Sequence, residues 1–182
     1  MKLAFALAAV LLAAPLAARA DIGLRVGADA TIAYHTGAHG TTSSSTTFIT
    51  DTWPLGGDLM LSYWTPGQIL SIDLEIAEQF YGSPPSSGNS RIGTVFRPGV
   101  RLSPPILPFY ARAAVPINFE QPTGHSRETY DLRLGAGFNI PLVLFKIYIE
   151  ADADFPLGGG DSSIGAFSNW ALLLNAGLDF RF

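Results

Sequence analysis

Long stretches in which apolar and polar side chains alternate constrain this sequence more than any other feature. Between positions 21 and 34 every even-numbered residue is apolar, and every odd-numbered residue except Ala33 is charged, polar or glycine. Successive side chains of a β-strand point to opposite faces, so a period of two predicts a strand with one apolar and one polar face.

The same alternation returns seven more times along the chain. The segments lie at about 53–64, 68–81, 91–102, 107–119, 129–140, 143–155 and 168–182. Strands of roughly 11–14 residues exceed the 5–6 residues usual in soluble sheets, and about 9–11 residues suffice for a tilted strand to cross a bilayer. The lengths therefore favour membrane-spanning strands over a soluble sandwich, the other fold that eight alternating strands could build.

The two faces of these segments differ in charge. The polar faces carry many charged residues and the apolar faces almost none, with Glu78 as the clear exception. Hydrocarbon offers the backbone no water, so a sheet crosses a membrane only if it closes and leaves no unpaired edge. We therefore predict an all-β fold, an antiparallel up-and-down transmembrane β-barrel of eight strands, with its apolar face toward lipid and its charged face toward the lumen.

Connections between the segments alternate in length. Short links fall at 65–67, 103–106 and 141–142, and longer polar ones at 35–52, 82–90, 120–128 and 156–167. Outer-membrane barrels have short periplasmic turns and longer outer loops. We therefore expect Asp21 and Phe182 on the periplasmic side and segment 35–52 outside the cell.

Aromatic residues gather near the strand ends, as expected for girdles at the two membrane–water interfaces. Those toward the long-loop rim are Tyr34, Trp53, Phe80, Phe119, Tyr130, Phe155 and Trp170. Those toward the turn rim are Tyr63, Phe109, Phe138, Phe145, Phe180 and Phe182.

The first 20 residues read as a cleavable secretory signal rather than as part of the fold. Lys2 precedes an apolar stretch at 3–14, and Ala18 and Ala20 form the small-x-small pattern that a signal peptidase accepts. The apolar stretch is too short to span a membrane as a helix. We assign residues 1–20 to the signal and 21–182 to a single barrel domain. Asp21 offers no thiol for lipid attachment.

Composition excludes several other classes of protein. Without Lys2 and Arg19 the chain has 9 basic and 15 acidic residues, a net charge of −6, so no basic surface indicates nucleic-acid binding. Cysteine is absent, which excludes disulfides and thiolate metal sites. Apolar residues make up 48%, yet no run of 18 follows the signal, so a helical membrane protein is disfavoured.

With this strand pattern, this alternation of links and a last strand at 170–182 that ends on Phe182, the chain resembles the small OmpA/OmpX-type outer-membrane barrels. The resemblance spans all of 21–182 and implies residence in a Gram-negative outer membrane, in contact with its lipid and lipopolysaccharide. It also implies that the barrel-assembly machinery reads the C-terminal strand through Phe182, and that the barrel is a monomer.

Charged residues on the polar faces form the candidate lumen. They are Arg25, Asp29, Asp58, Asp73, Glu75, Arg97, Arg101, Arg112, Asp131, Arg133, Lys146, Glu150, Asp152, Asp154, Asp179 and Arg181. An eight-stranded barrel is just wide enough for side chains to fill it, and buried charges must be paired. We expect a plug of forked Arg–carboxylate pairs, with an ion path as the alternative.

Three features of the predicted loops are candidate sites. His35 and His39 could bind a metal only if helical, but Gly37 separates them in a polar loop. His125, Ser126 and Glu128 invite comparison with lipid A deacylases, whose His-x-Ser motif puts both side chains on one strand face, whereas adjacent residues point to opposite faces. The Thr/Ser run at 41–47 reads as a flexible outer loop.

From these observations we predict a non-enzymatic structural or surface-interaction protein, with no catalytic, cofactor-binding or metal-binding residues. Two alternatives stay open. A lipid-modifying, deacylase-like enzyme would need Ser, His and an acid to converge near segment 118–128. A narrow channel for small solutes would need an open path past Arg97, Arg101 and Arg112.

Overall fold

The protein was analysed as a computed structural model, which describes residues 21–37, 44–48, 55–80, 92–104, 106–119, 130–158 and 170–182. The proposed signal at 1–20 lies outside these residues, as do His39, His125, Ser126 and Glu128. Within the described residues no helix is long and apolar enough to cross a membrane.

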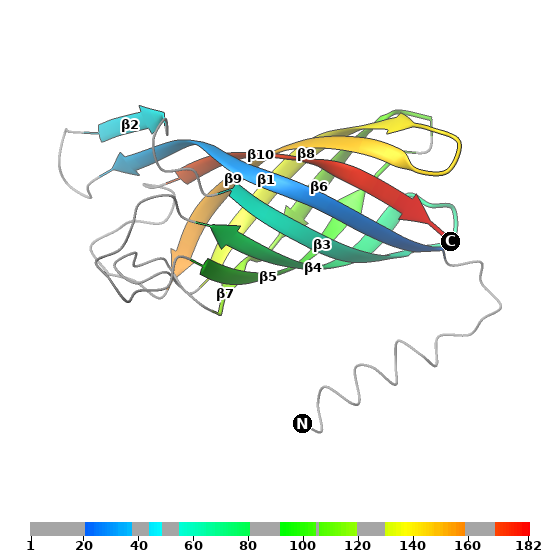
Figure 1. The fold of residues 1–182 in the computed structure, drawn as a ribbon, viewed down its shortest axis with the longest axis horizontal. Helices are drawn as coiled ribbons and strands as arrows, with labels where there is room; N and C mark the ends of the chain where they lie inside the picture. The colour runs from blue at the N-terminus through cyan, green and yellow to red at the C-terminus, as the bar shows by residue number, and fades with distance from the viewer. Residues whose placement is uncertain are drawn as a thin grey trace, which may run out of the picture.

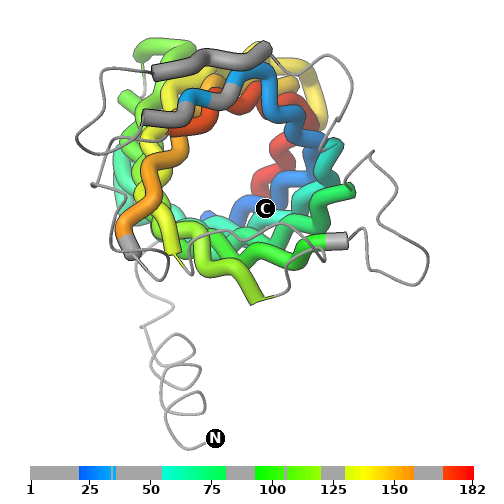
Figure 2. Tube along the Cα trace, turned by 90° about the vertical axis from the view of Figure 1, so that its left-hand side faces the viewer, coloured from blue at the N-terminus to red at the C-terminus, as the bar shows by residue number. Residues whose placement is uncertain are grey.

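Antiparallel strands, each paired with its neighbours, wind into a closed barrel (Figure 1). The strands are β1 (Ile22–Gly37), β2 (Ser44–Phe48), β3 (Leu55–Trp64), β4 (Leu70–Phe80), β5 (Ile92–Leu102), β6 (Phe109–Ala114), β7 (Ile117–Asn118), β8 (Tyr130–Pro141), β9 (Lys146–Gly158) and β10 (Trp170–Arg181). β10 pairs with β9 on one side and β1 on the other, which closes the ring seen end-on in Figure 2. β7 continues the path of β6, and β2 pairs only with the end of β1. The wall of the barrel therefore consists of eight strands, as predicted.

One predicted strand is interrupted. Segment 107–119 was expected to be continuous, but β6 ends at Ala114 and β7 resumes at Ile117. Pro116, between them, has no N–H to donate to a neighbouring strand. Its carbonyl still accepts a hydrogen bond from Asp131 N at 3.0 Å, and Val115 N donates to Pro98 O at 2.9 Å. The interrupted segment therefore remains hydrogen-bonded to the strands on both sides.

The expectation of a flexible loop across 41–47 is wrong where β2 forms. Residues 44–48 pair antiparallel with 33–37, so Phe48 lies opposite Ala33 and Ser44 opposite Gly37. Thr and Ser tolerate extended backbone well, and the unpaired edge of β1 beyond the barrel offers a template for a hairpin. The low-complexity Thr/Ser composition was therefore misleading, because part of this segment forms a strand.

A β-bulge also interrupts the pairing of β1 with β10. Thr31 lies opposite Leu173, and Ala33 lies opposite Leu172, so Ile32 is an extra residue in the ladder. An extra residue is left unpaired and bends the strand locally. Ala33, beyond it, is still buried at 2% exposure, as the predicted alternation requires.

The short connections lie at the same end of the barrel as Asp21 and Phe182 (Figure 1). The turn between β3 and β4 has hydrogen bonds from Thr65 N to Leu70 O at 2.8 Å and from Gln68 N to Thr65 O at 2.9 Å. Gly67 sits there at φ 89°, a backbone angle that glycine adopts without strain. At another turn Leu142 N donates to Phe145 O at 2.9 Å.

The two faces of the wall are those that the alternation predicts. Outward residues such as Leu61 (50% exposed) and Leu134 (47%) present apolar surface, whereas inward residues such as Arg25 and Arg97 are fully buried. Glu78, the one charge on the apolar face, accepts a hydrogen bond at 3.0 Å from Thr94, its cross-strand partner. The molecule is thus apolar outside and polar inside, which suits a wall in contact with lipid.

Outward aromatic rings meet in pairs near the strand ends. Phe109 packs against Phe138 with ring centroids 5.2 Å apart, and Phe145 packs against Phe180 at 5.8 Å, both near the turns. At the opposite end the rings of Phe96 and Phe119 lie 6.4 Å apart. The two pairs near the turns belong to the predicted girdle of that rim, and at the other end Phe119 was predicted but Phe96 was not.

Candidate functional site in the barrel lumen

The interior of the barrel holds the charged side chains that the polar faces predict. Their fractional exposure is 9% or less for Arg25, Asp29, Asp58, Asp73, Glu75, Arg97, Arg101, Arg112, Asp131, Arg133, Glu150, Asp152 and Asp179. Asp154, Lys146 and Arg181 are also inward but less buried. These side chains lie inside the ring of strands whose backbone is seen end-on in Figure 2.

Glu75, on β4, is the centre of one ion-pair group. Arg97 lies opposite it on β5 and donates from Nη1 to Oε1 at 2.5 Å, while Nη2 of the same arginine reaches Asp29 Oδ2 at 2.7 Å. Arg112 donates to the second oxygen of Glu75 and also to Glu150 Oε1, at 3.2 Å. Each carboxylate oxygen of Glu75 therefore accepts from a different arginine.

Arg25, on β1, forms a second group across the barrel. Its Nε donates to Asp179 Oδ2 at 3.0 Å, and Nη1 reaches Tyr110 Oη at 3.1 Å and Glu150 Oε2 at 3.4 Å. The guanidinium carbon lies 4.7 Å from the ring centre of Tyr110 and 4.3 Å from that of Tyr148. Cation–π contacts of this kind gain strength when water is excluded.

Arg101 joins this group to the turn end. It donates from Nη2 to Ser62 Oγ at 2.7 Å and to Asp73 Oδ1 at 3.1 Å, and its Nη1 lies 3.5 Å from Asp179 Oδ2. Its guanidinium also lies over the ring of Trp64, at 4.8 Å. The two groups are linked because Glu150 accepts from Arg25 and from Arg112.

Arg133 is the only one of the five buried arginines in the described chain to bind a carboxylate in the forked manner predicted. Its Nε and Nη2 reach the two oxygens of Asp154, its cross-strand partner, at 2.6 and 2.7 Å. The prediction of forked pairs is wrong for the other four, which each divide their donors between different acceptors. The carboxylates that bind these four arginines come from different strands of the ring, so each guanidinium has carboxylates from two strands within reach. This arrangement favours an arginine that binds two different carboxylates over a forked pair with one.

Glycines on the wall make room for the two buried tyrosines. Tyr148 lies opposite Gly177, which in turn lies opposite Gly27, and a Cβ at Gly27 would collide with Tyr148 Oη. Tyr110 lies opposite Gly137, where a Cβ would collide with the phenol ring. The tyrosines are therefore held flat against the wall, where they flank Arg25.

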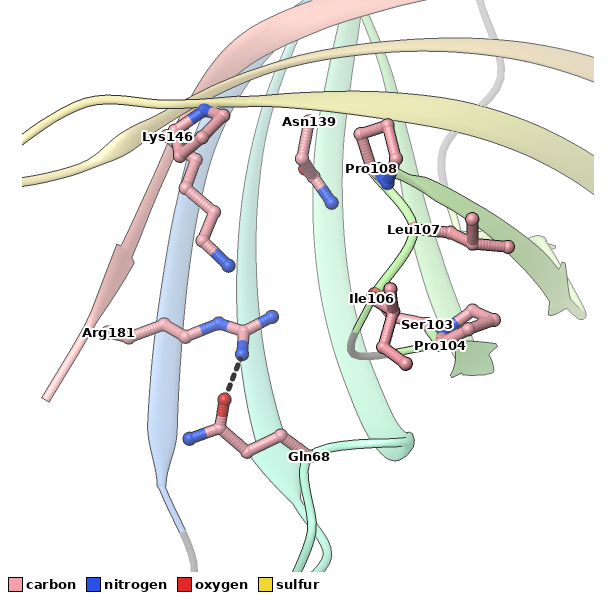
Figure 3. A pocket seen from close by; sticks show the side chains of 10 residues that line it. Gln68, Ser103, Pro104, Ile106, Leu107, Pro108, Asn139, Lys146 and Arg181 are labelled. Atoms are coloured by element: carbon pink, nitrogen blue, oxygen red, sulfur yellow. Dashed lines mark hydrogen bonds between the residues drawn. The ribbon is translucent and has the colours of Figure 1, made fainter.

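Two inward cations stand apart from this network. Lys146 and Arg181 lie at the turn end, beside a cavity of about 320 Å³ that Gln68, Asn139, Ser103 and several apolar turn residues also line (Figure 3). Arg181 Nη1 donates to Gln68 Oε1 at 2.9 Å, and its guanidinium lies 4.0 Å from the ring centre of Trp64. The prediction that they face carboxylates in pairs is wrong, since neither cation forms an ion pair within the part of the chain that the structure describes.

The structure gives little support to the candidate sites in the predicted loops. The ring of His35 stacks on that of Trp170 with centroids 5.0 Å apart, and His39 is not among the described residues. Residues 120–129, which include His125, Ser126 and Glu128, are also outside them. Over the described ranges no group of three or more His, Asp or Glu side chains could hold a metal ion.

Sequence reasoning overlooked several apolar residues in the lumen, among them Met60, Trp64, Ala77, Val95 and Leu173. Met60, Trp64 and Leu173 are at most 2% exposed and point inward. Met60 and Trp64 share the parity of Asp58 and Ser62, and Leu173 that of Asn175. The period of two alone predicts that they point inward, but the prediction of the lumen considered only the charged residues of the polar faces.

Comparison with known proteins finds likeness in fold and not in sequence. No protein-family model matches the chain, and no curated protein matches it by sequence. Among solved structures, Neisserial surface protein A (NspA), an eight-stranded outer-membrane barrel, superposes with a TM-score of 0.53 at 11% sequence identity. The match covers 88% of this chain and 97% of that one. The chain therefore has the fold of a small eight-stranded outer-membrane barrel.

Proposed function

We propose that this protein resides in the outer membrane as a barrel whose lumen is closed to solutes by a charge-paired plug, and that it serves a structural or surface-interaction role through its outer loops. The observation that carries the proposal is the network of five buried arginines, each ion-paired to at least one carboxylate. No chemistry of bond making or breaking is proposed for it.

Packing inside the barrel supports closure. Arg25 lies between two tyrosine rings, and Arg101 lies against Trp64, so planar groups and ion pairs cross the lumen together. Removing one member of a buried ion pair costs about 3–5 kcal/mol, because the partner charge is left unpaired. Such a network resists opening by small side-chain movements and favours a plug over a path for ions.

The location follows from the wall rather than from the lumen. An apolar outer face with aromatic rings near both ends suits a bilayer, and the fold is that of an outer-membrane protein. We infer export by the signal at 1–20, contact with outer-membrane lipid and lipopolysaccharide, and a monomeric state. The long connections then face outward and carry any recognition of partners at the cell surface.

Conductance measurements test the plug. Purified protein in planar bilayers should give no stable, large-conductance pore. Arg112→Ala should lower the free energy of unfolding by about 3–5 kcal/mol and still open no steady path, since it leaves Glu75 and Glu150 without a shared partner. Steady porin-like conductance from the wild-type protein would contradict the plug and favour the channel.

Assembly of the barrel depends, in this proposal, on the last residue of the last strand. Phe182 is 78% exposed, and its backbone closes the barrel by exchanging hydrogen bonds with Ile22. Phe182→Asp should therefore lower the amount of heat-modifiable protein in the membrane, because the assembly machinery loses its terminal aromatic. The matched control is Phe182→Tyr, which keeps the ring. Equal membrane levels for all three proteins would exclude a role for this side chain.

A further inference from the structure

The cavity at the turn end has the donors of an anion site. Lys146 enters it from the start of β9 and Arg181 from the end of β10, and both point into the same space (Figure 3). Two cations with no carboxylate bound are unusual in this barrel, where all five buried arginines have one. The charge at this end is thus available to a ligand.

Neighbouring residues hold Arg181 in place without neutralising it. Gln68 accepts from Arg181 Nη1 and donates its own amide N–H to the Asp21 carboxylate, and Trp64 supports the guanidinium from one face. Arg181 Nε is buried and has no hydrogen-bond partner among the residues that the structure describes. The guanidinium is therefore oriented before any ligand arrives, which lowers the entropic cost of binding.

Each acidic group near the cavity has a contact elsewhere, and among the described residues only Oδ1 of Asp179 is without a hydrogen bond there. Asp179 is bound by Arg25 and approached by Arg101, at 3.0 and 3.5 Å, and Asp21 accepts from Gln68. Asn139 offers a further donor, because its Oδ1 accepts from Arg25 Nη2 at 3.4 Å and its amide N–H₂ points into the cavity (Figure 3). The cavity therefore presents ammonium, guanidinium and amide donors together.

Opposite the cations the wall of the cavity is apolar. Ile106 and Leu107 are 91% and 56% exposed and lie in the turn between β5 and β6, next to Pro104 and Pro108. A ligand that fits both walls has an oxyanion at one end and carbon at the other. A tetrahedral phosphate has oxygens directed at several donors at once, which suits an arginine fork beside a lysine.

We propose that this cavity binds the phosphate group of a phosphate ester, held by Lys146 and Arg181. The phosphate could belong to a phospholipid headgroup or to a soluble phosphate ester, since both present the same oxyanion. The proposal concerns the turn end alone and does not depend on whether the lumen conducts.

Nuclear magnetic resonance on the whole folded chain in non-ionic detergent tests the site. Glycerol 3-phosphate serves as the soluble probe and dihexanoylphosphatidylglycerol, below its micelle concentration, as the lipid probe, with sodium chloride at equal ionic strength as the blank. At least one probe should shift the Arg181 Nε–H resonance with saturation. Saturation by both probes assigns a phosphate group in general, whereas saturation by one alone identifies the source.

Charge-removing variants supply the control. Lys146→Gln combined with Arg181→Gln, followed on the side-chain amide resonances of Asn139, which every variant keeps, should weaken binding at least about tenfold, the loss expected for charge-assisted hydrogen bonds. Arg127→Gln removes one positive charge from the segment that joins β7 to β8 and should leave binding unchanged. Heat-modifiable mobility in gels checks that each variant is folded.

Two results would overturn the proposal. One is an Arg181 resonance that responds to neither probe, or responds equally to chloride. The other is undiminished binding by the folded double variant, which would place the phosphate elsewhere on the barrel.

Discussion

At the scale of single residues, the lumen depends on where side chains are absent as much as on where they are charged. Gly27 and Gly137 stand on the inner face at the points where Tyr148 and Tyr110 lie against the wall. The same two rings flank Arg25, so a glycine on one strand positions an arginine on another. Small and charged residues on the polar face therefore form one packed unit.

A methyl group at Gly27 tests this coupling. Gly27→Ala places a Cβ in contact with Tyr148 Oη, and with Asp58 Oδ2 and Asn175 Oδ1 at 2.8 and 2.9 Å, so the ring must move away from Arg25. Overpacking of this kind costs about 1–3 kcal/mol. Urea unfolding of the protein from lipid vesicles measures the change.

The matched control is Gly57→Ala, on the outward face of the neighbouring strand. Its nearest heavy atom is Gly27 O at 4.0 Å, so the methyl group meets lipid and no side chain. This variant should be neutral, or more stable by up to about 1 kcal/mol, because alanine has less freedom than glycine in the unfolded chain. Equal losses for Gly27→Ala and Gly57→Ala would mean that the tyrosine packing is not tight.

At the scale of the strand, alternation assigns each residue to lipid or to lumen. In β8, Leu134 is 47% exposed on the outer face, and its neighbour Arg133 is 1% exposed within the lumen. Pairing with β6 places Leu134 opposite Ala113, and pairing with β9 places it opposite Ala153, so three adjacent strands present apolar groups at this level. Successive residues of this strand therefore face lipid and the lumen in turn.

A charge on the outer face of β8 should be costly. Leu134→Arg is expected to lower the free energy of unfolding in lipid by about 2–4 kcal/mol, the cost of arginine near the midplane of a membrane barrel. Leu134→Ile keeps the apolar surface and should change stability little. Equilibrium unfolding from phospholipid vesicles compares the three proteins, and a neutral Leu134→Arg would mean that this face does not meet hydrocarbon.

At the scale of the whole molecule, closure of the barrel sorts the connections to two ends. The turns at 65–69 and 142–145 lie at one end with Asp21 and Phe182, and β2 extends from the other (Figure 1). Because strands cross in alternate directions, one end must face the periplasm and the other the cell surface. In the orientation that we propose, with Asp21 and Phe182 on the periplasmic side, the turn-end cavity faces the periplasm.

Protease treatment of intact cells distinguishes the two orientations. We expect cleavage within 35–52 and none within 103–106, because the longer connections face outward in this class of barrel. Permeabilised cells give the control, in which the protease reaches both sides. Cleavage at 103–106 in intact cells would invert the orientation and place Lys146 and Arg181 at the cell surface.

Much of the fold was determined by the sequence alone, because a period of two specifies the face of every strand residue. That pattern was enough to predict eight strands, closure, the apolar exterior and the charged lumen, with Arg25, Arg97 and Glu75 inside. It also holds for Trp64, which follows the same parity. Whether a strand residue faces lipid or the lumen depends only on the local alternation, so it can be predicted without knowing which distant residues are its neighbours.

What only the tertiary structure decided is which of these residues meet. Arg25 and Asp179 lie 154 positions apart and become partners because β1 closes on β10 in one register. The bulge after Thr31 and the break at Pro116 shift the pairing locally, and the hairpin of β2 forms on the part of β1 that β3 does not pair. Alternation specifies a face but not a register, and therefore it could not separate five paired arginines from the unpaired Lys146 and Arg181.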